Sequence, residues 1–482
     1  MAGRRFQDWT NRNIFVNSFE SPSDFPLASY QNQCVGGEGS KDPYAWPDHE
    51  NNIDGALQSS QNFEDGVSNE PQSKANSGGD HLEEAEPVGT SITALQAAWN
   101  VTNAIQGMFI VGLPFAVKVG GWTAVFAFVW VAYVCYRTGL SLIDCLYEDE
   151  IAEAVRSGLG KFVLFAQLTE LASTCILYLV LAGDLLQGCV PSIDRSAWMM
   201  LVAAMLLGTA FLDDIRIVSH LSLANAVSHL VINAIIVLYC LSQIGEWKLS
   251  TVAFLPNFRL LPTVLGVVVF GYTSHIFLPA LEGSMEDPKE FPWMLRWSHI
   301  SAAFFKAIFG LIGFLTFAEF TQKEISNSLP NQFFKVVVNM VLVVKALLSY
   351  PLPYFAIVKL MTDNFFRGAK FTWFSSCYGA DRTLREWAVC LRIILLLWTL
   401  MMALSVPYLI EFMGLIGNIT GTVLSFIWPA YFHLRLKGSK LSIQEQRFNK
   451  FVIGMGFVIC LVGVYYSAME LRSAMTANQQ YQ

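Results

Sequence analysis

The hydrophobic residues of this 482-residue chain gather in long, uninterrupted runs that begin near residue 95. A bilayer core about 30 Å thick needs about 20 apolar residues in a helix, and the runs reach that length. Only helices and closed barrels satisfy their backbone hydrogen bonds inside a membrane, and the runs are too continuous for barrel strands. The pattern therefore predicts an all-α polytopic membrane protein with eleven transmembrane helices. The predicted spans are 96–118, 122–146, 162–186, 197–212, 218–242, 260–281, 297–318, 335–361, 387–410, 412–433 and 450–470.

Charge divides the chain at the same boundary. Residues 1–90 hold 15 Asp and Glu but only 5 Lys and Arg, and they are rich in Ser, Asn, Gly and Pro. Such a segment cannot bury enough apolar surface to fold, so we predict a disordered acidic tail. The tail lacks the apolar stretch of a signal peptide. No basic stripe points to a nucleic-acid partner, and the nine cysteines show no metal-binding or redox spacing, so neither a metal nor a cofactor is expected.

The short loops predict how the chain crosses the membrane. Those on the side of the tail carry fourteen Lys and Arg, and those on the opposite side carry seven. Cytosolic loops are enriched in Lys and Arg, so the tail is predicted to be cytosolic. With an odd number of spans, the short C-terminus at 473–482 then lies on the lumenal or external side, after a membrane domain at 91–472. The glycosylation sequon at Asn418 falls inside a predicted span, so we expect it to be unused.

Two spans contain glycines, small polar residues and a proline that argue against continuous helix. In the first span these residues occupy 103–114, and in the sixth they occupy 270–283. Each interruption ends in Leu-Pro, at Pro114 and at Pro279, so the two breaks occupy corresponding positions in two successive sets of five helices. Paired interruptions of this kind are typical of inverted-repeat transporters. We predict a five-plus-five inverted repeat with broken helices 1 and 6, in which repeat one covers about 96–242, repeat two covers about 260–433, and an extra helix follows at about 450–470.

An interrupted helix offers backbone groups to a solute. The first N–H groups and last C=O groups of a helix lack partners within it, and the helix dipole favours an anion at the amino end. A zwitterion suits two such breaks, because its carboxylate meets free amides and its ammonium meets free carbonyls. Two prolines in span 8, Pro351 and Pro353, free further carbonyls near Ser349. We predict transport of a small zwitterionic solute, most simply an amino acid. The candidate substrate-binding residues are Gln106, Gly107, Phe109, Gly112, Phe270, Tyr272, Thr273, Ser274 and Ser349.

Ionisable residues inside the spans are the second functional signal. A charge at the centre of a bilayer costs at least about 2.5 kcal/mol, so such residues usually face a partner or a water-filled cavity. Glu170 and Lys345 have opposite charges near the middle of spans 3 and 8, and His275 lies at the break of span 6. We predict that these three residues take part in proton coupling, with a buried Glu170–Lys345 ion pair that only fixes packing as the alternative. Lys306 in span 7 is interpreted as a packing or snorkelling lysine.

Other classes of membrane protein fit less well. Two interrupted spans with buried charges argue against a receptor, whereas a leak conductance stays open. No paired intramembrane aspartates, His-rich cluster or nucleophile–base arrangement suggests an enzyme.

Four segments of the chain form a specific set of motifs. The first is Trp-Asn-Val-Thr-Asn-Ala-Ile-Gln-Gly-Met-Phe at 99–109, followed by Gly-Leu-Pro at 112–114. The others are the break at 272–283, Lys-Ala-Leu-Leu-Ser-Tyr-Pro-Leu-Pro at 345–353, and Phe-His-Leu-Arg-Leu at 432–436. These segments resemble the vesicular inhibitory amino acid (GABA and glycine) transporters, a branch of the amino acid/auxin permease superfamily. The resemblance extends from about residue 91 to about residue 470. Phe115 departs from the family, where a tyrosine is expected, and the 147–161 segment is shorter than is usual there.

The resemblance implies an antiporter that uses alternating access to load GABA, glycine or both into synaptic vesicles. It also implies eleven spans, a cytosolic N-terminus and a lumenal C-terminus. The proton is the implied coupled ion, and chloride has been proposed as a second. A plasma-membrane proton- or sodium-coupled amino acid symporter of the same superfamily is the alternative. The bilayer and the amino acid are the expected partners, and the tail is a candidate binding site for vesicle-sorting adaptors.

Overall fold

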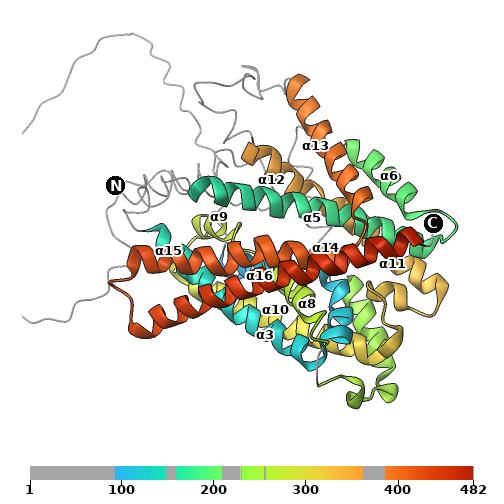
Figure 1. Cartoon of the computed structure of the whole chain (residues 1–482), viewed down its shortest axis with the longest axis horizontal. Helices are drawn as coiled ribbons and strands as arrows, with labels where there is room; N and C mark the ends of the chain where they lie inside the picture. Colours follow the sequence, from blue (N-terminus) through green and yellow to red (C-terminus); the bar gives the residue numbers. More distant parts are fainter. Residues whose placement is uncertain are drawn as a thin grey trace, which may run out of the picture.

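The computed structural model describes residues 93–147, 159–208, 228, 231–254, 257–361 and 386–480. All regular secondary structure in these ranges is helical, and the helices gather in one bundle (Figure 1). The predicted tail at 1–90, most of the 147–161 segment, the last four residues of predicted span 4 and most of the first half of predicted span 5 lie outside the described residues.

Within the described ranges, seven helices are long and apolar enough to cross a membrane, and three further apolar helices are shorter. The chain is therefore an all-helical polytopic membrane protein, as the hydrophobic pattern predicts. The long helical spans are Phe109–Leu146, Gly160–Cys189, Pro288–Phe320, Gln332–Val358, Ala388–Ser405, Leu409–Lys437 and Ile443–Thr476. The shorter ones are Arg195–Leu206, Val231–Ser242 and Leu261–Phe270.

The first predicted span is interrupted where its glycines indicate. Helix α2 (Ala94–Gln106) stops before Gly107, whose φ of 23° is a conformation that favours glycine. A single turn of 3-10 helix, η1 (Met108–Gly112), follows, and α3 (Leu113–Leu146) then begins with Pro114 in its first turn. Proline is well suited to that position because it has no N–H to leave unsatisfied.

The structure differs from the sequence prediction at the boundary between spans 1 and 2. The prediction ends span 1 at residue 118 and starts span 2 at residue 122, whereas α3 includes both segments and turns at Gly121, which has a φ of 56°. The backbone N–H of Trp122 donates to the carbonyl of Ala253 at 3.1 Å, and a Cβ at Gly121 would overlap that carbonyl. A distant loop therefore shapes this turn, which local sequence alone does not reveal.

The sixth predicted span is interrupted in the same manner. Helix α8 (Leu261–Phe270) ends at the first break residue, and the short helix α9 (Leu278–Gly283) begins again with Pro279 in its first turn. Residues 271–277 connect the two through turns rather than regular helix. Both predicted interruptions are thus present, and each resumes at the predicted Leu-Pro.

Helix α8 lies at the centre of the packing. It contacts α3 on one side and, on the other, α14 (Leu409–Ile416) and the π-helical segment η9 (Gly417–Gly421). The backbones approach so closely that a Cβ at Gly266 would overlap the carbonyl of Gly414. Around this centre, α10 (Phe291–Phe317) packs on α3 and α2. A second group of helices surrounds α5 (Leu159–Cys189), which packs on α11 (Gln332–Ser349), α12 (Pro351–Met361) and α6 (Arg195–Leu206).

The last spans begin and end elsewhere than predicted. Helix α13 (Glu386–Ser405) ends before Pro407, and α14 begins at Leu409, so the predicted boundary between 410 and 412 is too late. The helix that starts at α14 continues through η9, a second π-helical segment η10 (Val423–Ile427), and α15 (Trp428–Lys437). Helix α16 (Ile443–Gln480) extends well beyond the predicted 450–470, and it continues through most of the segment predicted as a short C-terminus. The short 3-10 helices of the connections are Ile244–Glu246, Leu249–Thr251, Pro288–Glu290, Ala318–Phe320 and Ile325–Ser328.

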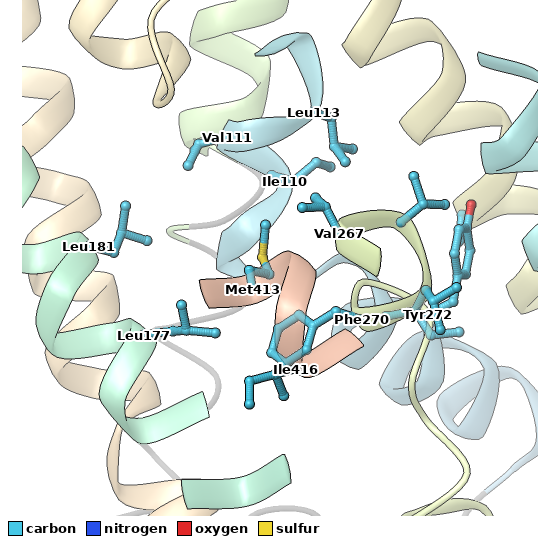
Figure 2. Packing of buried hydrophobic residues seen from close by; sticks show 14 of the residues in the cluster. Ile110, Val111, Leu113, Leu177, Leu181, Val267, Phe270, Tyr272, Met413 and Ile416 are labelled. Atoms are coloured by element: carbon cyan, nitrogen blue, oxygen red, sulfur yellow. The ribbon is translucent and has the colours of Figure 1, made fainter. Parts of the chain in front are cut away.

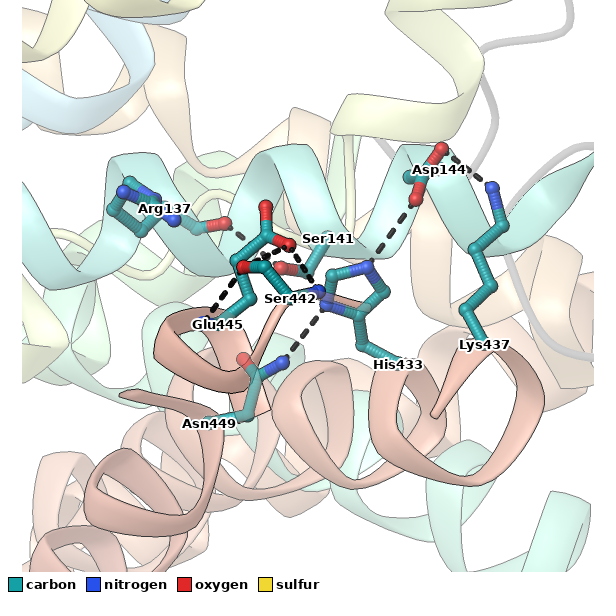
Figure 3. Close-up of polar contacts among 8 residues, drawn as sticks. All are labelled: Arg137, Ser141, Asp144, His433, Lys437, Ser442, Glu445 and Asn449. Atoms are coloured by element: carbon teal, nitrogen blue, oxygen red, sulfur yellow. Dashed lines mark hydrogen bonds and ion pairs between the residues drawn. The ribbon is translucent and has the colours of Figure 1, made fainter. Parts of the chain in front are cut away.

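A polar network joins α3, α15 and α16 at one end of the bundle (Figure 3). Asp144 pairs with Lys437 at 2.7 Å and with the Nε2 atom of His433 at 3.2 Å. The other imidazole nitrogen of His433 lies 2.9 Å from the amide nitrogen of Asn449. Helix α16 starts with a reciprocal capping arrangement between Ser442 and Glu445, which satisfies backbone donors at its first turn.

Candidate functional site: the two helix breaks

The two breaks meet through aromatic rings. Phe109 in η1 packs edge to face against Phe270 at the end of α8, with ring centroids 5.5 Å apart. On its other side, Phe109 stacks on Tyr178 of α5 at 5.2 Å with an interplanar angle of 24°. Residues from the first break, the second break and α5 therefore share one contact. Sequence reasoning places Phe109 and Phe270 in the site and misses Tyr178.

Tyr178 extends the site toward span 8, because its hydroxyl lies within hydrogen-bonding reach of Ser349. Ser349 is the last residue of α11, and α12 begins one residue further on, at Pro351. Tyr178 lies about two helical turns beyond Glu170 on α5, so the two share roughly one helix face. That spacing is the sequence signal that would have identified Tyr178.

The main chain of the first break presents free carbonyls and the positive end of a helix dipole. Gln106 ends α2, so the last carbonyls of that helix lack intrahelical partners, and Gly107 turns the chain away. Gly112 precedes α3, whose positive dipole end faces the break. A Cβ at Gly112 would lie 2.9 Å from the Cδ1 atom of Ile410, so α14 covers this turn closely.

Phe270 and Tyr272 leave the second break in different directions. Phe270 lies beside Met413 and Ile416, whereas the ring of Tyr272 points away from them (Figure 2). Tyr272 is fully buried, and the Nζ atom of Lys306 lies 3.7 Å from its ring centroid. The structure therefore places the Tyr272 side chain against α10 and away from the Phe109–Phe270 contact.

The next three break residues make local contacts. The hydroxyl of Thr273 donates to the carbonyl of Val269 at 3.0 Å, one helical turn earlier. Ser274 is buried, and no hydrogen-bond partner is found for its hydroxyl among the described residues. The Nε2 atom of His275 lies 3.0 Å from the hydroxyl of Thr138 on α3, and the imidazole is 2% exposed. Their roles in binding and proton coupling stay predictions.

Glu170 contacts the segment η9, in the tenth predicted span, rather than span 8 in this conformation. Its carboxylate accepts a hydrogen bond from the hydroxyl of Thr420 in the π-helical segment η9. Lys345 is also buried, on the neighbouring α11, but no ion pair within the described ranges joins Lys345 to Glu170. Sequence reasoning misses Thr420, which it treats only as part of the sequon at Asn418. Asn418 is itself fully buried and donates to the carbonyl of Pro262.

A polar pocket with a volume of about 340 Å³ lies at the end of the bundle predicted to face the lumen. Arg195 pairs with Asp184 there at 2.9 Å, and Lys323 pairs with Glu411 at 2.6 Å. Burial, reinforced by the nearby Asp184 carboxylate, raises the pKa of Glu324 to about 8. The full lining is Asp184, Gln187, Gly188, Arg195, Gln322, Lys323, Glu324 and Asn327.

Another contact lies at the opposite end and joins α9 to the residue that follows α3. The hydroxyl of Tyr147, just past α3, donates to the carboxylate of Glu282, which is fully buried. The backbone of Lys323 passes close to Gly112 in the first break. The breaks therefore lie between the Tyr147–Glu282 contact and the Lys323–Glu411 pair.

Comparison with known proteins finds relatives over most of the chain. Residues 90–469 match the family described as transmembrane amino acid transporter protein. The chain is 56% identical over 493 residues to a vesicular GABA transporter of Caenorhabditis elegans, with 99% of each chain covered. It is 41% identical over 409 residues to a vesicular inhibitory amino acid transporter of Xenopus tropicalis, covering 80% of this chain and 79% of that one. Among solved structures, a Na+-coupled sialic acid symporter in a substrate-bound, outward-open state aligns with a TM-score of 0.48 and 12% identity, covering 78% of this chain and 90% of that chain.

The match to the family extends over most of the chain, and the two relatives are aligned with 99% and 80% of it. The chain therefore belongs to the transmembrane amino acid transporter family, within the branch of the vesicular inhibitory amino acid transporters, and it is a transporter rather than an enzyme.

Proposed function

We propose that this protein loads GABA, glycine or both into synaptic or other cytoplasmic vesicles in exchange for protons. The observation that carries the proposal is the meeting of the two helix breaks, where Phe109 contacts Phe270. The chain's similarity to the vesicular GABA transporter of the worm and the vesicular inhibitory amino acid transporter of the frog supports the substrate class and the vesicular membrane.

The backbone of the breaks explains the preference for a zwitterion. The substrate carboxylate binds at the amino end of α3, near Gly112, where the helix dipole is positive. The ammonium binds carbonyls near the ends of α2 and α8, at Gln106 and Phe270. The phenyl rings of Phe109 and Phe270 cover the methylene groups between the two charges.

The proposed cycle is alternating access in an eleven-span, five-plus-five inverted repeat. The N-terminus lies in the cytosol, the C-terminus lies in the lumen, and the acidic tail is the segment available to sorting adaptors. The site opens to the cytosol to take up the amino acid, and it then opens to the lumen to release it. The Tyr147–Glu282 contact and the Lys323–Glu411 pair close the two sides in turn.

The vesicle's proton gradient supplies the driving force. A membrane potential of 100 mV is worth about 2.3 kcal/mol per charge, and one pH unit is worth about 1.4 kcal/mol. Exchange for one or two protons thus suffices to concentrate a zwitterion strongly. Glu170, Lys345 and His275 are the predicted coupling residues, and chloride is proposed as a second coupled ion.

Uptake into reconstituted proteoliposomes tests the proposal. Radiolabelled GABA or glycine is expected to accumulate when the lumen is acidified, with no sodium present. Uptake that disappears only when sodium is removed would instead support the plasma-membrane symporter. Saturable counterflow, in which internal unlabelled substrate accelerates entry of label, distinguishes either transporter from a channel, because a pore cannot show it.

A further inference from the structure

The ammonium group of Lys306 is directed at the second helix break. Its Nζ atom donates to the carbonyl of Gly271 at 2.5 Å, at the position where α8 ends. The same atom lies 3.7 Å from the ring centroid of Tyr272, within the range of a cation–π contact. Lys306 is 2% exposed and lies near the middle of α10, so its ammonium does not snorkel to an interface.

Glycine at position 271 makes this contact possible. A Cβ built there would lie 3.1 Å from the Nζ atom of Lys306, closer than ordinary side-chain packing allows. The carbonyl that accepts the hydrogen bond is one that the break leaves without an intrahelical partner. The negative end of the α8 dipole points the same way and favours a cation.

No carboxylate neutralises this lysine within the described residues, because none of their ion pairs includes it. The titratable groups around it are neutral when they hold their usual protons. Helix α3 contributes Cys135, the break contributes Tyr272 and His275, and α10 itself contributes His299, whose ring stacks 6.5 Å from that of Tyr272. Helix α2 contains no titratable side chain.

We propose that Lys306 carries the exchanged proton, because the helix break that lines the substrate site also supplies the two groups that bind its ammonium. This inference rests on the proposed proton exchange and names a coupling residue beyond Glu170, Lys345 and His275. When the break at Gly271 and Tyr272 moves, the ammonium loses both partners. A buried charge without partners is strongly disfavoured, so the proton leaves.

The proton balance follows from that movement. In the lumen-facing state the break binds the ammonium, and Lys306 takes a proton from lumenal water. In the cytosol-facing state the break shifts, the N–H bond breaks, the electron pair stays on Nζ, and the proton passes to cytosolic water. The neutral amine leaves the break free to close around an amino acid. Proton affinity and substrate affinity are thus linked through one segment of backbone.

Charge variants of Lys306 in proteoliposomes test this inference. Lys306→Gln keeps a hydrogen-bond donor and Lys306→Met keeps the length, but neither can carry a proton. Both are expected to retain substrate counterflow, which needs no proton. The accumulation of substrate driven by an acidic lumen is expected to fall by about tenfold for each pH unit of the gradient. Lys306→Arg stays charged at every relevant pH, so it is expected to lose both activities while eluting as a folded monodisperse protein. Lys450→Met, at an exposed lysine of α16, is the matched control and is expected to behave as the unmodified protein.

The outcomes separate the two proposals. Normal acid-driven accumulation in any of the three variants overturns the role of Lys306. Loss of counterflow in both neutral variants also overturns it, because Lys306 is then a structural or binding residue. If the unmodified protein shows counterflow but no response to an acidic lumen, the proposed proton exchange itself fails.

Discussion

Phe109 packs edge to face on Phe270, with ring centroids 5.5 Å apart, and this pair joins the two helix breaks. Both rings belong to segments where the backbone leaves the helix, so any rearrangement of one break is felt at the other. Tyr178 on α5 holds Phe109 from the other side. The aromatic cluster therefore couples the substrate-binding backbone to the surrounding helices.

Truncation of either ring is expected to weaken substrate binding. Edge-to-face pairs contribute about 1 kcal/mol, so Phe109→Ala and Phe270→Ala should each raise the KM for uptake by about fivefold or more. In the double variant, the loss of binding free energy should be smaller than the sum of the losses in the two single variants, because each single change already removes the shared contact. Phe333→Ala, at a ring that is 78% exposed, is the control and should leave KM unchanged. Fully additive effects would show that the two rings act independently.

Neutralising Glu170 is expected to separate binding from coupling. Glu170→Gln keeps a group that accepts from Thr420 but removes the charge, so counterflow should persist while pH-driven uptake falls. Thr420→Val, which removes the hydroxyl, should shift the pH dependence of uptake without abolishing it. Lys345→Met, alone and combined with Glu170→Gln, shows whether the two groups act as a pair. Normal pH dependence in both single variants would remove them from the coupling mechanism.

Glu324 is expected to make the fold more stable in acid. Burial and the Asp184 carboxylate raise its pKa from 4.5 to about 8, so the folded state binds this proton more tightly than the unfolded chain. Stability attributable to this group is therefore full below about pH 4.5 and falls as the pH rises toward about 8. Glu324→Gln removes that slope, so the variant should have the higher Tm at pH 8 and no advantage at pH 4.5.

Thermal unfolding of detergent-solubilised protein measures this difference across the pH range. Glu319→Gln, at an exposed carboxylate of the same loop, is the matched control. A Tm difference that is constant with pH would contradict the buried, protonated state of Glu324.

A charge swap tests the Lys323–Glu411 pair. Lys323→Glu and Glu411→Lys each place two like charges where the structure has an attractive contact at 2.6 Å. Each single change should lower the rate of uptake, and the double swap should recover much of it, because opposite charges meet again. Lys323 is partly exposed, so recovery of about 1 kcal/mol or less is expected. A double variant no better than the worse single one would exclude a direct role for the pair.

Local sequence predicts the helix breaks because their cause is local. Gly107 adopts a backbone angle that favours glycine, and Pro114 and Pro279 restart their helices at a position that suits proline. The pattern of apolar runs similarly predicts an all-helical membrane protein. These features need no knowledge of which helices are neighbours.

The contacts of the site depend on tertiary packing, and sequence reasoning misses them. Thr420 approaches Glu170 because the chain after α14 adopts π-helical turns beside α5, and no periodicity in the sequence marks those turns. Lys306 is a lone lysine in an apolar span until α10 is placed against the break at Gly271. The turn at Gly121 is determined by Ala253, more than a hundred residues away.

Binding of radiolabelled GABA to the purified Gly107→Ala protein tests the central claim most directly. The φ of 23° at Gly107 is strained for any residue with a Cβ, although the nearest atom to that Cβ would be the Ala104 carbonyl oxygen at 3.5 Å. The change therefore alters the backbone of the break without crowding its neighbours. We predict at least about a tenfold loss of affinity, equivalent to about 1.4 kcal/mol, in a protein that still elutes as folded. Gly454→Ala, in open space on α16, should bind normally. Unchanged affinity in the Gly107→Ala protein would contradict the claim that the backbone of the broken helices binds the amino acid.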